Sequence, residues 1–150
     1  MAKTPRRDKG EPMPLERVIH IAEFRAGLRT FVRRSERIAQ RWQLTPQRYL
    51  LLLIVKGASD GSERVTFSEA AERMQLSKNT VTDLVSRAEE VGLVFREPSD
   101  HDQRVVYIRL TEEGERRLCG ALIENEGYRR ELVQAFEELA ASFKTAARVR

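Results

Sequence analysis

The segment SDHDQRVVYIRL, residues 99–110, carries a run of charged and polar side chains directly before an extended apolar run. Asp100, His101 and Asp102 offer ligand types that metal ions use, but three neighbouring side chains on one loop usually point in different directions. Arg104 offers another chemistry, because a guanidinium forms paired hydrogen bonds with a phosphate, and Asp102 is placed to brace it. The segment indicates either a phosphate-contacting loop or a loop that is polar only because it is exposed.

A helix with one polar face is predicted in KNTVTDLVSRAEEVG, residues 78–92, because apolar residues recur there at helical spacing. Ser77 is a good N-cap, and Gly92 suits the position after the last turn. The inward residues are Val81, Leu84, Val85 and Ala88, and the outward residues are Asn79, Thr82, Asp83, Ser86 and Glu90. The second set therefore faces away from the core.

The elements before this helix follow from caps and periodicity. A long helix spans residues 15–43, and its apolar stripe has Ser35 as its one polar interruption. Thr45 and Pro46 start a second helix, whose seven consecutive apolar residues leave no exposed face, so we expect it in the centre. Thr66 and Glu69 form a capping box that opens a third, short helix.

Two strands, residues 93–97 and 104–110, follow the polar-faced helix and are joined by the polar loop. Thr111 then caps another helix, with acids in its first turn where the helix dipole favours them. A final helix carries Leu132, Phe136, Leu139 and Phe143 at spacings of three and four. Because the first and last helices both offer apolar seams, we expect them to pack together and against a second subunit.

Two short helices joined by a tight turn, then a two-stranded hairpin, are the order of a winged helix-turn-helix, whose second helix reads the major groove. The polar loop is then the wing. We predict a mainly α fold with a small β-wing: a winged helix-turn-helix domain flanked by N- and C-terminal dimerisation helices. Its parts are a disordered basic arm (1–14), the dimerisation helices (15–43 with 112–150), and a DNA-binding lobe (44–111) that is one compact structural unit.

The chain resembles the MarR family of bacterial transcriptional regulators over about residues 44–118, in LTPQRYLLLLIVKG, VTFSEAAERMQLSKNTVTDLVSRAEEVGLV and SDHDQRVVYIRLTEEGERRL. The most specific pieces are Asp102 with Arg104 in the wing, and LTEEG after the second strand. The resemblance implies a homodimer that binds pseudo-palindromic double-stranded DNA in promoters, most often as a repressor. It also implies release by a small ligand, often aromatic or phenolic, or by an oxidant.

The resemblance and the helix periodicity together nominate three sets of residues. The DNA-binding set is Ser77, Lys78, Asn79, Thr80, Thr82, Asp83, Ser86, Arg87, Asp102 and Arg104. The dimerisation set is Ile21, Phe24, Leu28, Phe31, Leu132, Phe136, Leu139 and Phe143. The ligand set is Phe24, Arg25, Phe31, Trp42 and Tyr49, which ordinary packing explains as well. Asp83 departs from the family's usual basic or neutral residue, and either reads a cytosine amino group or is braced by Arg87.

Composition limits which other classes of protein the chain could belong to. The chain has 150 residues, a net charge of +4, 41% hydrophobic and 33% charged residues, which suits one soluble domain. No apolar run could span a bilayer and the N-terminus lacks the apolar segment of a secretory signal, so we expect a cytoplasmic protein without membrane partners. Two histidines and no glycine-rich phosphate loop leave no catalytic constellation, so we predict no enzyme, cofactor or metal.

Two alternatives stay open. The winged region could serve as a dimeric module for a protein partner instead of DNA, and Asp83 with Glu90 would suit a basic one. The single cysteine, Cys119, could sense oxidants, because Arg116 and Arg117 beside it favour a thiolate. A free cysteine is also commonly just a small buried hydrophobe.

Overall fold

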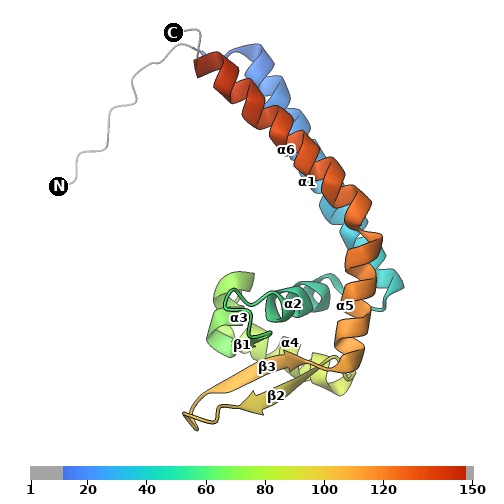
Figure 1. Cartoon of the computed structure of the whole chain (residues 1–150), viewed down its shortest axis with the longest axis vertical. Helices are drawn as coiled ribbons and strands as arrows, with labels where there is room; N and C mark the ends of the chain where they lie inside the picture. The colour runs from blue at the N-terminus through green and yellow to red at the C-terminus, as the bar shows by residue number, and fades with distance from the viewer. Residues whose placement is uncertain (1–11, 148–150) are drawn as a thin grey trace, which may run out of the picture. The chain divides into compact units, whose positions relative to one another are not determined.

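The computed structural model describes residues 12–147. Residues 1–11 of the predicted basic arm therefore lie outside the described residues. In chain order the elements are α1 (Leu15–Arg41), α2 (Pro46–Lys56), β1 (Arg64–Thr66), α3 (Phe67–Met74), α4 (Lys78–Glu90), β2 (Val94–Pro98), β3 (Val106–Leu110), α5 (Glu112–Glu124) and α6 (Glu126–Ala147) (Figure 1). The mainly helical fold with a small sheet confirms the predicted class.

The described chain divides into two compact units. We call residues 32–128 the core unit, and residues 12–31 with 129–147 the helix pair. The end of α1 and the whole of α5 thus belong with the winged region, because Ile38 and Ala39 of α1 and Leu118 and Ala121 of α5 are buried. The sequence assigned both segments to the dimerisation helices.

The core unit is built around α2, which packs against α3, α5 and β3. Leu51, Leu52 and Val55 on this helix are fully buried, and burying each such side chain stabilises the fold by about 1.5–3 kcal/mol. Val81 and Val85 of α4 are also fully buried, so the predicted inward face of that helix is confirmed. The same core therefore fixes the position of α4.

The prediction that α2 has no exposed face is wrong. Leu50 and Leu53 are 40% and 36% exposed. Seven consecutive residues of a helix point in every direction around its axis, at 3.6 residues per turn. Only those that face the rest of the core unit are enclosed.

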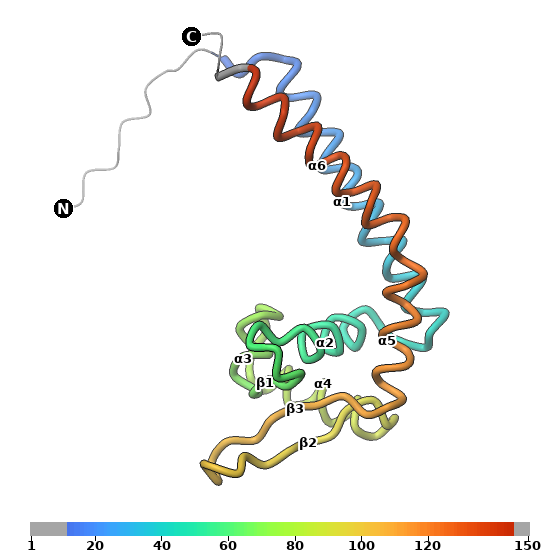
Figure 2. The backbone as a smooth tube through the Cα atoms, viewed as in Figure 1, coloured from blue at the N-terminus to red at the C-terminus, as the bar shows by residue number. Residues whose placement is uncertain are grey.

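The sheet has three antiparallel strands in the order β1-β3-β2 (Figure 2). Ile108 of β3 pairs with Val65 of β1. The hairpin of β2 and β3 was predicted, but β1 was not. Its three residues are too few to show an alternation, and its last residue, Thr66, is also the N-cap of α3. The sheet ties the wing to the start of α3.

The helix pair joins the first part of α1 to α6, which run side by side in opposite directions (Figure 2). The rings of Phe24 and Phe136 meet edge to face with centroids 5.5 Å apart, and the Arg17 guanidinium lies 4.4 Å from the Phe143 ring centre. The expectation that the two apolar seams pack together is confirmed.

Among the described residues, none of the helices combines the length and apolar composition that crossing a bilayer requires.

Candidate nucleic-acid interface

The turn between α3 and α4 is set by two local devices. Gln75 ends α3 in the left-handed conformation at φ 56°, and its N–H donates to the carbonyls of Ala71 and Glu72. Ser77 caps α4, because its Oγ accepts from the Thr80 N–H at 3.2 Å. A tight turn of this kind fixes the angle at which α4 leaves α3, as a helix-turn-helix requires.

The exposed face of α4 carries the residues that the sequence nominated. Exposed are Ser77, Lys78, Asn79, Thr80, Thr82, Asp83 and Arg87, and Ser86 is half-buried. Four hydroxyl groups among them already have partners inside the protein. The Ser77 and Thr80 hydroxyls bond to each other at 2.8 Å, and Thr82 Oγ1 donates to the Lys78 carbonyl at 2.9 Å.

The fourth hydroxyl, that of Ser86, accepts from Arg96 Nη2 at 3.0 Å. Arg96 Nε also donates to Glu89 Oε2 at 2.9 Å, and the guanidinium lies 5.1 Å from the centre of the Phe67 ring. This arginine of β2 therefore connects the wing sheet to α4 and α3. Sequence analysis missed it, although strand alternation places Arg96 opposite buried Ile108, on the side that faces α4.

The wing loop is a closed turn. The Ser99 N–H donates to the Val105 carbonyl at 3.0 Å, and Ser99 Oγ accepts from the His101 N–H at 3.2 Å. Asp102 Oδ1 accepts from the Arg104 N–H at 3.0 Å and from its Nε at 3.4 Å. Asp102 thus braces Arg104 as predicted, while the Arg104 side chain remains 92% exposed.

The base of the wing is held by an ion-pair cluster across the three strands. Glu97 of β2 accepts from Nη1 of Arg64 on β1 at 2.8 Å and from Nη1 of Arg109 on β3 at 3.1 Å. The hydrogen bond from Arg64, and to a lesser degree that from Arg109, holds the pKa of Glu97 below its usual range. The carboxylate therefore stays charged. The Arg64 guanidinium also stacks 4.1 Å from the Tyr107 ring centre. The wing is therefore presented by a cross-braced sheet.

A groove of about 470 Å³ lies between these elements. It is lined by Thr66, Phe67, Ser68, Thr82, Arg96, Arg104, Val105 and Val106. The lining combines the start of α3, the face of α4 and the wing, with two guanidinium groups and three hydroxyl groups. The guanidinium groups of Arg96 and Arg104 are the parts of this lining that can pair with a phosphate.

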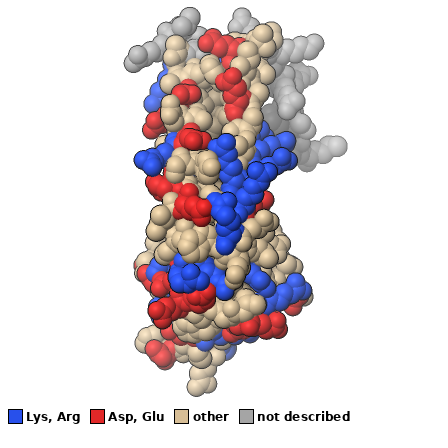
Figure 3. All heavy atoms as spheres, turned by 90° about the vertical axis from the view of Figure 1, so that its right-hand side faces the viewer, with Lys and Arg blue, Asp and Glu red and all other residues tan. Residues whose placement is uncertain are grey.

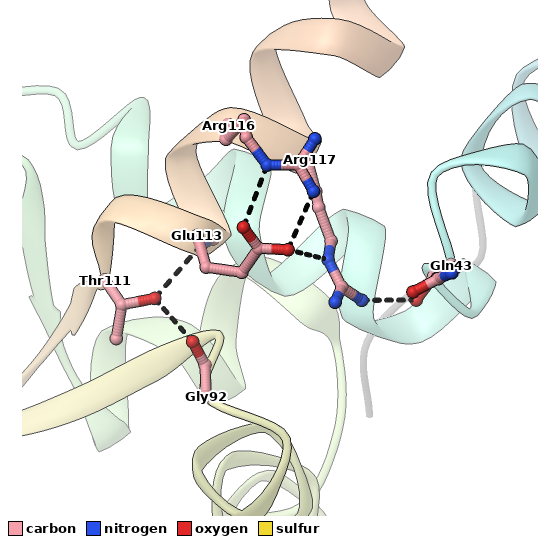
Figure 4. Close-up of polar contacts among 7 residues, drawn as sticks. Gln43, Gly92, Thr111, Glu113, Arg116 and Arg117 are labelled. Atoms are coloured by element: carbon pink, nitrogen blue, oxygen red, sulfur yellow. Dashed lines mark hydrogen bonds and ion pairs between the residues drawn. The ribbon is translucent and has the colours of Figure 1, made fainter.

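The start of α5 fixes the far end of β3 (Figure 4). Thr111 caps α5 and donates through Oγ1 to the Gly92 carbonyl at 2.6 Å. Glu113 accepts from Arg116 and Arg117, and these guanidinium groups lower the pKa of its carboxyl to about 2. The two positive charges that neighbour exposed Cys119 in the sequence are thus already paired, and the alternative that Cys119 senses oxidants gains no additional support.

The nominated ligand residues fall in both units. Phe24, Arg25 and Phe31 are in the helix pair, while Trp42 and Tyr49 are half-buried in the core unit. Trp42 Nε1 donates to Glu124 Oε2 at 2.8 Å, and a side chain at Gly120 would meet the Trp42 ring at 2.3 Å. The packing interpretation therefore accounts for Trp42 in this structure.

One face of the molecule carries charges of both signs. Figure 3 shows basic and acidic side chains intermixed over this face.

Among residues 12–147, no group of three or more histidine, cysteine, aspartate or glutamate side chains is arranged to hold a metal ion. Asp83 and Arg87 form no ion pair within the same residues, so of the two alternatives for Asp83 the bracing by Arg87 is not seen.

Comparisons with known proteins agree with this geometry. The sequence model of the MarR family matches residues 42–105. YsmB of Bacillus subtilis, an uncharacterized HTH-type transcriptional regulator, is 30% identical over 133 residues, which are 85% of this chain and 86% of that protein.

Two solved structures share the fold over nearly the whole chain. A MarR family protein from Bacillus stearothermophilus has a TM-score of 0.65 at 28% identity, over 91% of this chain and 94% of that one. A MarR family transcriptional regulator from Streptomyces coelicolor, solved in complex with DNA, has a TM-score of 0.64 at 21% identity, over 95% and 89%.

Proposed function

The chain belongs to the MarR family of transcriptional regulators, and on that premise we propose that it is a homodimeric, sequence-specific repressor. In this proposal each α4 enters a major groove of a pseudo-palindromic operator and each wing contacts the flanking backbone or minor groove. The observation that carries the proposal is the exposed polar face of α4, held beside a braced wing by Arg96. We place its action in the cytoplasm, where a bacterial regulator meets its DNA.

The helix pair supports the homodimer. No side chain described in it is buried, while Val18, Ile19, Val133 and Phe136 are among its exposed apolar residues. Apolar surface of this extent on a helix pair marks an interaction site. A second copy of the same pair is the partner that every molecule of the protein has available, and a two-fold dimer is the commonest assembly.

Release by a small aromatic or phenolic ligand is the third part of the proposal, and it is supported by family membership. A ligand acts in this way if it binds better to a form of the dimer whose α4 helices do not match the spacing of the grooves. Tyr49 and the other nominated residues stay candidates for that site. Loss of operator binding on addition of phenolic acids, with Tyr49→Phe as a variant, would test it.

The first test is selection of bound fragments from genomic DNA at two salt concentrations. The proposal expects an inverted repeat beside promoters, retained at the higher concentration. Random fragments lost at modest salt would contradict a sequence-specific regulator and favour a protein partner for the winged region. Binding to such a partner need not follow the linear dependence on log salt concentration that DNA binding shows.

The wing has its own test in Arg104→Ala. We expect weaker binding to all DNA sequences, with the log–log salt slope reduced by about one because one phosphate contact is lost. Arg130→Ala removes a charge from α6 and serves as the matched control, with an unchanged slope. Wild-type affinity of Arg104→Ala would show that the wing does not contact DNA.

A further inference from the structure

The outward face of α4 carries three polar side chains four residues apart: Asn79, Asp83 and Arg87. All three are exposed, and none forms a side-chain hydrogen bond or ion pair within residues 12–147. The hydroxyl groups around them are bonded inside the protein, as described above. Lys78 and Glu90, in the first and last turns of the helix, are likewise exposed and have no side-chain partner within residues 12–147. Between them, Asn79, Asp83 and Arg87 form a row of polar groups that keep their full bonding capacity for another molecule.

The spacing of the row matches the spacing of bases. Successive members lie about 6 Å apart along the helix axis, at 1.5 Å per residue. That distance corresponds to roughly two base-pair steps of 3.4 Å. Asp83 is the middle member and lies in the first half of α4, the part of a recognition helix that approaches base edges.

Asp83 is the member whose chemistry restricts its partner most. A carboxylate only accepts hydrogen bonds, so it finds no favourable contact on the phosphate backbone, which repels it. Arg87, one turn further on, does not neutralise it in this structure. An acid at this place therefore weakens binding to DNA unless a base edge offers it a donor.

We propose that Asp83 is a specificity-determining residue that selects a cytosine in each operator half-site by accepting a hydrogen bond from its N4 amino group. This inference rests on the proposed DNA-binding function of α4. Guanine presents two acceptors in the major groove and thymine presents one with a methyl group, so both oppose a carboxylate. Adenine offers its N6 amino group only beside the N7 acceptor, whereas cytosine offers an amino group without a neighbouring acceptor on the same base.

The selection acts mainly by repulsion. Asp83 lowers the affinity for every DNA sequence that lacks the cytosine, and it is tolerated only where the N4 amino group of cytosine is present. Specificity then comes from weaker binding to the wrong DNA sites. Removing the carboxylate should therefore raise affinity for non-operator DNA while it removes one base preference. A residue that merely supported the helix would not change these two quantities in opposite directions.

The experiment measures binding to the selected operator with each half-site base pair replaced in turn, at one fixed salt concentration. Wild type should prefer C·G at one position by roughly 5- to 100-fold, the discrimination of one good base contact. Asp83→Ala should reduce that preference to about twofold or less and tighten binding to a non-operator duplex. Asp83→Asn should move the preference towards adenine, which an amide pairs with at N6 and N7.

Glu90→Ala is the matched control, because it removes an exposed acid from the last turn of the same helix. It should tighten non-operator binding without changing any base preference. Because the Asp83 side chain is exposed and has no partner in the described part of the chain, equal thermal unfolding midpoints of the variants are expected. An Asp83→Ala protein with the wild-type base preferences would overturn the inference and leave the proposed function standing. A wild type that selects no operator would overturn the proposed function itself, and the inference with it.

Discussion

The core unit and the helix pair use apolar residues in opposite ways. In the core unit, apolar side chains of α2, α4, β3 and α5 close on one another, and every buried residue of the described chain lies there. In the helix pair, Phe24 and Phe136 touch each other, yet Phe136 remains 58% exposed. The first region completes its core within one chain, and the second exposes apolar surface that one chain cannot cover.

A polar pair marks the end of the buried core. Ser35 is the first buried residue of α1, and Asn125, at the junction of α5 and α6, is the last buried residue along the described chain. Asn125 Nδ2 donates to Ser35 Oγ at 2.7 Å, while its Oδ1 has no partner. Ser35, the one polar interruption of the apolar stripe on α1, therefore lies where this helix changes from residues that are not buried to residues that are buried in the core unit.

The largest effect expected from this contrast is that of Leu52→Ala, compared with Leu28→Ala. Leu52 is fully buried, so its truncation should lower the free energy of unfolding by about 2–5 kcal/mol. Leu28 is 38% exposed in the helix pair, and at protein concentrations too low for association its truncation should cost less than about 1 kcal/mol. Urea unfolding followed by circular dichroism measures both. Equal losses at low concentration would erase the distinction between the two regions.

Phe136→Asp tests the exposed side of the contrast. A charge at this position should raise the dimer dissociation constant by at least about 100-fold, because an unpaired carboxylate would have to be buried in the association. Sedimentation at micromolar concentration should then show a monomer whose core unit stays folded. Glu137→Ala, which changes an exposed acid on the same helix, should stay dimeric. A dimeric Phe136→Asp would move the interface away from this seam.

Ser35→Ala tests the boundary between the regions. The change leaves the whole Asn125 amide buried without a partner, at a cost of about 1–3 kcal/mol in unfolding free energy. The double variant Ser35→Ala with Asn125→Leu removes both polar groups, so it should recover part of that loss. Strict additivity of the two single changes would mean that the hydrogen bond contributes nothing.

The features that sequence predicted best are those that depend on a few neighbouring residues. The N-caps Thr45, Thr66, Ser77 and Thr111 all accept the expected backbone hydrogen bond, because a cap involves only the next three residues. The inward face of α4 follows from periodicity for the same reason.

The features that sequence missed depend on contacts between distant segments. Arg96 meets Glu89 on α4 and Phe67 on α3, and no local pattern distinguishes it from the exposed arginines. Strand β1 exists because β3 lies beside it, and the exposure of Leu50 depends on which sides of α2 other elements cover. The nominated DNA contacts are exposed except Ser86, which is half-buried, and which of them meets a base stays a prediction.

The smallest effect expected is that of pH on the stability contributed by the ion pairs of Glu113 with Arg116 and Arg117 in α5. Arg116 and Arg117 lower the pKa of Glu113 from an ordinary value of 4.5 to about 2, so the folded state favours the charged carboxylate. The contribution to stability is therefore complete above pH 4.5 and is lost as the pH falls through about 2. Glu113→Gln should be less stable than wild type near neutral pH, and the two unfolding curves should converge towards pH 2. The difference should be small and should shrink with added salt, because Glu113 and Arg116 are solvent-exposed. A difference that persists at pH 2 would assign Glu113 a packing role instead of an electrostatic one.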